Sequence, residues 1–195
     1  MRPAVFLDRD DTLIDTHGVT RDTAHPGDLG NPDLVRLLHG VADALARLRS
    51  AGYPLIVFSS QGGVARGGYG LDAVEAVNQR LRDLLRAAMR LAPHDEPFAG
   101  LYYCPFHPHG DTPPFNTEHD WRKPGPGMIL AAARELGLDL ARSWAVGDKP
   151  RDTEAAINAG IPAARTFVIR TSGEDGPCAD LAEAAARILA SKNSP

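Results

Sequence analysis

The chain lacks several features that would assign it to a common class of protein. Its 195 residues include only two cysteines, Cys104 and Cys178, which excludes a framework of disulfide bonds. It has no long basic run and a formal net charge of −4, so the electrostatic signature of nucleic-acid binding is missing. It has no apolar run typical of a signal peptide or a membrane span. We therefore expect a cytoplasmic protein without nucleic-acid or membrane partners.

Short apolar runs alternate with helical periodicity along the chain. The apolar runs predict strands at residues 3–7, 54–58, 100–103, 144–146 and 166–169. Between them, apolar residues at three- and four-residue steps predict helices over residues 34–48, 71–91, 129–136, 151–159 and 181–189. Strands that alternate with helices indicate an α/β fold, a Rossmann-like sandwich of three layers around a parallel sheet. The length fits one domain over residues 1–195.

Two segments show neither the apolar runs of strands nor the three- and four-residue spacing of helices. They are residues 11–31 and residues 104–126, and the second holds six of the 16 prolines and three of the seven histidines. Each follows a predicted strand, and ligands of parallel sheets bind beyond the carboxyl ends of the strands. We expect both segments to overhang one rim of the sheet. Neither is long enough to form an independent cap domain.

The first predicted strand ends in two carboxylates one residue apart, Asp8 and Asp10. Alternation along an extended chain points both in the same direction and Arg9 in the opposite one. Two adjacent carboxylates repel each other, and both stay ionised only near a cation. The pair is thus a candidate metal and phosphate site. For an Asp-x-Asp pair alone, the alternative is a solvated acidic turn.

Three later segments place further polar groups after predicted strands. They are the glycine-rich turn Ser59-Ser60-Gln61-Gly62-Gly63, the pair Arg122-Lys123 before a helix, and the run from Asp148 and Lys149 to Asp152. Backbone N–H groups of a glycine-rich turn can hold a phosphate, and an acidic protein needs local cations to do so. Each segment alone is typical of an ordinary loop. Together with the Asp8 and Asp10 pair they make four segments, and all four, in this order and each behind a predicted strand, indicate one phosphate site.

These four segments resemble the four motifs of the haloacid dehalogenase-like (HAD) phosphohydrolases. The matching residues are 8–12, 59–67, 121–128 and 146–152, so the resemblance spans nearly the whole chain. Within that superfamily, Lys-Pro-Gly-Pro-Gly-Met, Val-Gly-Asp-Lys and His17-Gly18 are most similar to the D,D-heptose 1,7-bisphosphate phosphatases and the related histidinol-phosphatases.

The resemblance implies a two-step reaction. Asp8 attacks phosphorus and forms an aspartyl-phosphate, while Asp10 acts as general acid and then as general base. Mg²⁺ binds Asp8, the backbone carbonyl of Asp10 and Asp148. Asp152 braces a metal-bound water or Lys149 from behind. Ser59 and Lys123 hold the phosphoryl oxygens.

The resemblance also implies which residues contact the substrate. Arg122 matches the recognition arginine of the family, and the other positions near the substrate are Thr16, His17, Gly18, Val19, Ser60, Gln61, Gly62, Arg66 and Lys149. For Arg66 the alternative is a surface arginine at a helix start, and for His17 a histidine that faces water. We expect a monomeric, Mg²⁺-dependent phosphatase of a small-molecule phosphomonoester.

Several substrates and one other class of function remain open. Ala65-Arg66-Gly67 and His17-Gly18 favour heptose bisphosphate, and histidinol phosphate is the alternative. A catalytically impaired binding module on the same fold is the competing class. A phospho-accepting signalling domain is less suited, because such domains place the acceptor after a middle strand.

The sequence departs from the family pattern at three places. Asp11 replaces a glycine, which a tight turn can tolerate, and Ser59 and Ser60 replace threonine and asparagine. Many relatives bind Zn²⁺ in the loop before the Arg-Lys-Pro, but here three of the four ligand positions hold Phe106, His119 and Trp121. We favour a loop without zinc, held by packing of Phe106, Phe115 and Trp121. The alternative is a rebuilt zinc site formed by Cys104, His107, His109 and His119.

Overall fold

Five short strands form one parallel sheet. This computed structural model describes residues 1–169 and 178–191. The strands lie in the order β3-β2-β1-β4-β5 and comprise β1 (Val5–Leu7), β2 (Leu55–Ser60), β3 (Gly100–Cys104), β4 (Trp144–Gly147) and β5 (Thr166–Val168). All neighbours are parallel, which confirms the five predicted strands and the α/β class.

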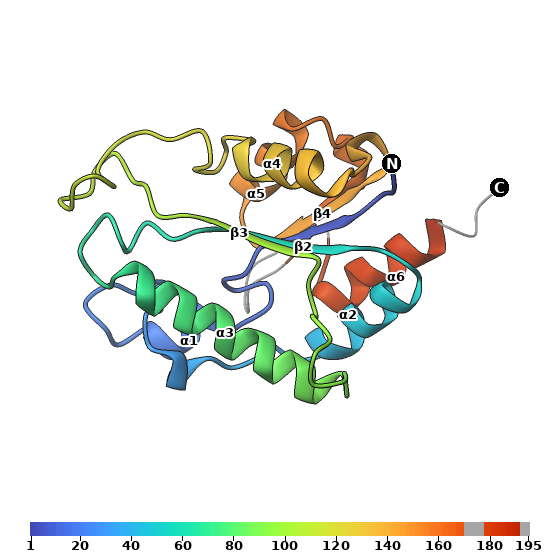
Figure 1. The fold of residues 1–195 in the computed structure, drawn as a ribbon, viewed down its shortest axis with the longest axis horizontal. Coiled ribbons are helices and arrows are strands. Elements are labelled where there is room, and N and C mark those ends of the chain that lie inside the picture. The colour runs from blue at the N-terminus through green and yellow to red at the C-terminus, as the bar shows by residue number, and fades with distance from the viewer. Residues whose placement is uncertain (170–177, 192–195) are drawn as a thin grey trace.

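Helices cover both faces of the sheet (Figure 1). One face packs against α4 (Gly127–Leu136) and α5 (Pro150–Asn158), and the other lies toward α1 (Thr16–Thr20), α2 (Val41–Ser50), α3 (Leu71–Ala88) and α6 (Leu181–Ser191). Strand alternation explains the two cores, because Val5 and Leu7 lie in one apolar cluster and Phe6 in the other. None of the described helices is long and apolar enough to cross a membrane.

Both irregular segments lie at the carboxyl edge of the sheet, on the left in Figure 1. Residues 104–126 contain no helix and no strand beyond Cys104, as predicted. Residues 11–31 do contain one short helix, α1, which the sequence analysis missed. Asp15 caps it, because its carboxylate accepts the Gly18 N–H at 2.9 Å. Within the described residues no large cap domain covers this edge.

The helix predicted over residues 34–48 is wrong in its first half. Pro32–Leu34 forms a single 3₁₀ turn, and α2 begins only at Val41. Between them, Leu37 pairs with Ile14 as an isolated bridge, and Gly40 has a φ of 74°. That left-handed backbone conformation interrupts a helix and favours glycine. The apolar residues of this stretch therefore pack on the core without forming a helical turn.

Candidate active site

Three carboxylates from two segments meet at the carboxyl edge of the sheet. Asp8 follows β1, Asp148 follows β4, and Asp152 lies in the first turn of α5. Leu7 pairs with Val146 across the neighbouring strands, so the residues that follow them emerge side by side. Oxygen atoms of the three carboxylates lie within 4.8 Å of one another, and all three residues are buried.

Lys123 enters this cluster from the loop before α4. Its Nζ lies 2.5 Å from Asp8 Oδ1 and 2.6 Å from Asp152 Oδ1, and it donates to the Phe58 carbonyl oxygen at 3.1 Å. Burial lowers the pKa of Lys123, but Asp8 and Asp152 outweigh burial and raise it. The lysine is therefore a fixed positive charge next to Asp8.

The carboxylates outnumber the cations that face them. Burial raises the pKa of Asp8 well above its usual range, Lys123 opposes this rise, and the charge of Asp152 adds to it. Burial and then Asp152 raise the pKa of Asp148 to about 6, although Lys149 Nζ lies 3.1 Å from its carboxylate. A cluster of carboxylate oxygens with surplus negative charge is the donor set that Mg²⁺ prefers, so the residues present fit this ion.

The carboxylate of Asp10 is held by a separate set of donors. It accepts hydrogen bonds from Thr16 Oγ1 at 2.6 Å, Gln61 Nε2 at 2.7 Å and Ser59 Oγ at 3.0 Å. Arg9 Nη2 forms an ion pair with it at 3.0 Å. Burial raises the pKa of Asp10, but the Arg9 charge and the donated hydrogen bonds outweigh burial, so the pKa lies below its usual value.

The prediction that Arg9 points away from the carboxylates is wrong. β1 ends at Leu7, so strand alternation no longer applies at residue 9. The Arg9 side chain is fully buried, and its guanidinium contacts Asp10 as well as Asn78 Oδ1 at 2.8 Å. Asn78 belongs to α3, so Arg9 links Asp10 to the layer of helices beneath the sheet.

Asp11 adopts the backbone conformation of the glycine that it replaces. Its φ of 56° lies in the left-handed region, which aspartate tolerates better than most residues. Its carboxylate accepts the N–H groups of Thr16 and His17 at 3.0 and 2.8 Å, and so fixes the start of α1. Burial raises the pKa of Asp11, with a further contribution from Asp10. This substitution therefore preserves the turn and adds a cap to α1.

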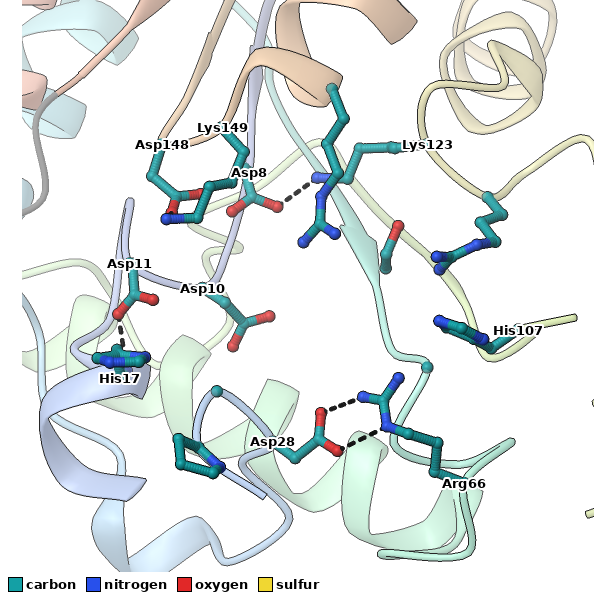
Figure 2. Close-up of a pocket in the computed structure, with 16 residues that line it drawn as sticks. Asp8, Asp10, Asp11, His17, Asp28, Arg66, His107, Lys123, Asp148 and Lys149 are labelled. Carbon is teal, nitrogen blue, oxygen red and sulfur yellow. Dashed lines mark hydrogen bonds and ion pairs between the residues drawn. The ribbon is translucent and has the colours of Figure 1, made fainter. Parts of the chain in front are cut away.

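A cavity of about 340 Å³ opens above these groups (Figure 2). Ten residues predicted for the site line it, namely Asp8, Asp10, His17, Ser60, Gly62, Arg66, Arg122, Lys123, Asp148 and Lys149. Six further residues line it that were not predicted for the phosphate site, namely Asp11, Pro26, Gly27, Asp28, His107 and Arg151. Of these, His107 was a candidate zinc ligand. We call the part around Asp8, Asp148 and Lys123 the acidic side, and the part around Arg66, Arg122 and Arg151 the arginine side.

Five residues expected near the substrate do not line the cavity. Thr16, Ser59 and Gln61 contact the Asp10 carboxylate, so they stand behind that residue. Gly18 donates its N–H to Asp15, and Val19 packs against the larger apolar core. In this structure the first three therefore hold Asp10 in place.

Asp28 and Arg66 form an ion pair across the mouth of the cavity (Figure 2). Arg66 Nη2 lies 2.5 Å from Asp28 Oδ1, and Arg66 Nε lies 3.2 Å from Asp28 Oδ2. The pair joins the 11–31 loop to the turn after β2. Sequence patterns gave no signal for it, because the partners are 38 positions apart and neither belongs to a periodic run.

Stacked rings hold the 104–126 loop. The His119 ring lies parallel to the Phe106 ring with centroids 4.3 Å apart, and Phe115 meets Phe106 edge-on at 5.5 Å. His119 Nδ1 accepts the Trp121 N–H at 3.0 Å. Within the described residues, the ligand atoms of Cys104 and the loop histidines are not gathered as a cluster of three or more. The predicted contact of Phe106 with Phe115 is present, whereas Trp121 meets His119 and Tyr102 edge-on.

Comparisons with known proteins place the chain in a family. A family model described as HAD-hydrolase-like matches residues 120–190. D-glycero-beta-D-manno-heptose-1,7-bisphosphate 7-phosphatase of Escherichia coli (strain K12) is 38% identical over 159 residues, 82% of this chain and 75% of that protein. The chain belongs to the HAD-like hydrolases. The relative of the same name from Rhodopseudomonas palustris is 37% identical over 174 residues, 89% of this chain and 86% of that protein.

A solved structure agrees with this assignment. D,D-heptose 1,7-bisphosphate phosphatase from B. bronchiseptica, complexed with magnesium and phosphate, superimposes with a TM-score of 0.75 at 26% identity, covering 98% of this chain and 99% of that one. This HAD-like hydrolase is therefore a phosphatase that hydrolyses phosphomonoesters, as the motifs predicted. Its cluster of Asp8, Asp148 and Asp152 could hold a metal ion.

Proposed function

We propose that this phosphatase removes the 7-phosphate of a heptose 1,7-bisphosphate and needs Mg²⁺ to do so. The observation that carries the proposal is the meeting of Asp8, Asp148 and Lys123 at one wall of a cavity large enough for a sugar phosphate. The names of the relatives from E. coli and R. palustris support the substrate. The magnesium and phosphate in the B. bronchiseptica structure support the cofactor.

Asp8 is the nucleophile in this proposal. One of its oxygens forms a bond to phosphorus while the bond from phosphorus to the sugar oxygen breaks, which leaves an aspartyl-phosphate. Water then attacks phosphorus and releases inorganic phosphate and the free carboxylate. Lys123 lies next to Asp8 throughout and offsets the charge of the phosphoryl oxygens, where negative charge gathers in the transition state.

Asp10 moves the protons. In its protonated form Asp10 donates a proton to the sugar oxygen as the bond from phosphorus to that oxygen breaks, and the charge of Arg9 favours that donation. The carboxylate left behind, whose low pKa favours the ionised form, then accepts a proton from the water that attacks the aspartyl-phosphate, so that Asp10 is protonated again. Thr16, Ser59 and Gln61 hold the carboxylate in one orientation, which is what proton transfer at a fixed atom requires.

Asp8, Asp148 and the backbone carbonyl of Asp10 would hold the Mg²⁺. When bound, this ion offsets the negative charge of the phosphoryl group and of the carboxylates. Asp152 contacts Lys123 and accepts the Lys149 N–H at 2.9 Å, so it supports the ligands from behind. The Ser60 hydroxyl is buried without a hydrogen-bond partner among the described residues, and Ser60 lines the cavity. A phosphate oxygen or a sugar hydroxyl would supply the missing partner.

A substrate screen tests the proposal. Purified protein with Mg²⁺ is assayed against heptose 1,7-bisphosphate, other sugar mono- and bisphosphates, histidinol phosphate and an aryl phosphate. We expect the highest kcat/KM for the heptose bisphosphate, with release of the 7-phosphate. The Asp8→Asn variant should lose turnover of every substrate. A preference for histidinol phosphate, or full activity of Asp8→Asn, would refute the proposal.

A further inference from the structure

The cations that line the cavity differ in whether a carboxylate neutralises them. Lys123 pairs with Asp8 and Asp152, Lys149 lies against Asp148, and Arg66 pairs with Asp28. The remaining two cations of the lining are Arg122 and Arg151. In the part of the chain that the structure describes, neither forms an ion pair with a carboxylate. The arginine side therefore carries two guanidinium groups without a direct carboxylate partner, and the more distant charge of Glu118 acts on Arg122.

The two arginines lie next to the groups that face the acidic side. Arg122 precedes Lys123, and Arg151 precedes Asp152 in the first turn of α5, just after Pro150. In both segments one residue turns toward the carboxylate cluster and its neighbour lines the cavity. In each segment, therefore, adjacent residues serve the two sides of one cavity, so a single ligand there meets both the acidic side and the arginine side.

Arg122 and Arg151 also act on each other. Burial lowers the pKa of Arg122, and the positive charge of Arg151 lowers it further. Two guanidinium groups that repel each other at the wall of a cavity gain free energy when an anion enters between them. Guanidinium groups also match the oxygens of a phosphate by paired hydrogen bonds.

We propose that Arg151 binds, with Arg122, a second phosphate of the substrate while the first lies at Asp8, and that Asp28 neutralises Arg66 and so weakens its attraction for that phosphate. The inference rests on the proposed phosphatase function and adds Arg151 and Asp28 as residues that determine substrate choice. The enzyme then favours a sugar bisphosphate over the matching monophosphate because of Arg122 in the loop before α4 and Arg151 in the first turn of α5.

Competition against an aryl phosphate tests the inference. Hydrolysis of p-nitrophenyl phosphate with Mg²⁺ is followed while heptose 1,7-bisphosphate or heptose 7-phosphate is added, which gives an inhibition constant for each ligand whether or not it is turned over. In Arg151→Gln we expect the constant for the bisphosphate to rise about tenfold, as for loss of one charged hydrogen-bond pair. The constant for the 7-phosphate and the aryl phosphate kinetics should stay within about twofold.

Arg80→Gln is the matched control, because Arg80 is an exposed arginine on α3 that does not line the cavity. It should change neither constant. Equal weakening of both ligands in Arg151→Gln, or no weakening, would overturn the role of Arg151. If the wild-type protein turns over no heptose phosphate but binds the bisphosphate more tightly than the 7-phosphate, the proposed substrate fails and the second phosphate site stands.

Asp28→Asn tests the second half of the inference in the opposite direction. Removing the charge of Asp28 leaves the positive charge of Arg66 available to the ligand, so the constant for the bisphosphate should fall by about threefold, the scale of a partly exposed charge pair. A rise of that constant would show that Asp28 instead positions Arg66 for the phosphate. That result would contradict the proposed neutralisation of Arg66.

Discussion

Strand ends supply the Asp8 and Asp148 carboxylates of the acidic side, whereas loops and the first turn of α5 supply the arginine side. On the acidic side, the pairing of β1 with β4 sets Asp8 beside Asp148, and Lys123 bonds to two carboxylates at once. On the arginine side, the only described ion pair is Asp28 with Arg66, which ties one loop to another. The comparison shows that strand pairing positions the two carboxylates, whereas a side-chain ion pair between loops positions Arg66.

The largest expected difference is in how far substitution of two neighbouring cations, Lys123 and Arg122, lowers the free energy of unfolding. In Lys123→Met, the buried carboxylates of Asp8 and Asp152 lose their shared cation, so the free energy of unfolding should fall by about 3 kcal/mol. Activity should be lost as well. Urea denaturation with and without Mg²⁺ measures the change, and Mg²⁺ should restore part of the stability because it supplies positive charge to the same cluster.

Arg122→Met is the matched control for this comparison. Arg122 is the next residue along the chain and has no carboxylate partner among the described residues, so its loss should change the free energy of unfolding by less than about 0.5 kcal/mol. Similar destabilisation by both substitutions would contradict the distinction between a cation that is paired with buried carboxylates and one that is not.

A smaller effect is expected where α1 supports Asp10. Thr16→Val removes the 2.6 Å hydrogen bond to the Asp10 carboxylate and keeps the shape of the side chain. We expect kcat to fall about tenfold with KM unchanged, because the substitution disturbs a proton-transfer group and no substrate contact. Steady-state kinetics on an aryl phosphate measures the split.

The neighbouring residue His17 provides the control for Thr16. His17 lines the cavity, so His17→Ala should change KM for a sugar phosphate and leave kcat on an aryl phosphate nearly constant. An increase of KM without loss of kcat in Thr16→Val would instead make Thr16 a substrate-binding residue, as its position in the family motif first suggested.

The same division explains how far the sequence could predict the structure. Asp8 and Asp148 follow recognisable apolar runs, so the pairing of β1 with β4 brings them together, and Lys123 was predicted from its motif before α4. The predicted direction of the Arg9 side chain was wrong because β1 ends at Leu7, two residues before Arg9. The Asp28–Arg66 pair depends on how two irregular loops fold against each other, and no periodicity or motif encodes that contact.

The smallest expected effect lies in the 104–126 loop, where ring stacking and a metal make opposite predictions. Phenylalanine at position 119 keeps a flat ring against Phe106 but cannot bind zinc. If stacking holds the loop, His119→Phe should shift Tm by less than about 2 °C, since only the Trp121 N–H bond is lost. A large drop in Tm, together with one zinc per chain in the wild type by elemental analysis, would show that the loop is held by metal. His119→Ala removes both the stacking on Phe106 and the hydrogen bond from the Trp121 N–H, so it should lower Tm further than His119→Phe. Equal shifts in the two variants would mean that the ring contributes nothing and that this loop, like the Asp28–Arg66 contact, depends on polar pairing.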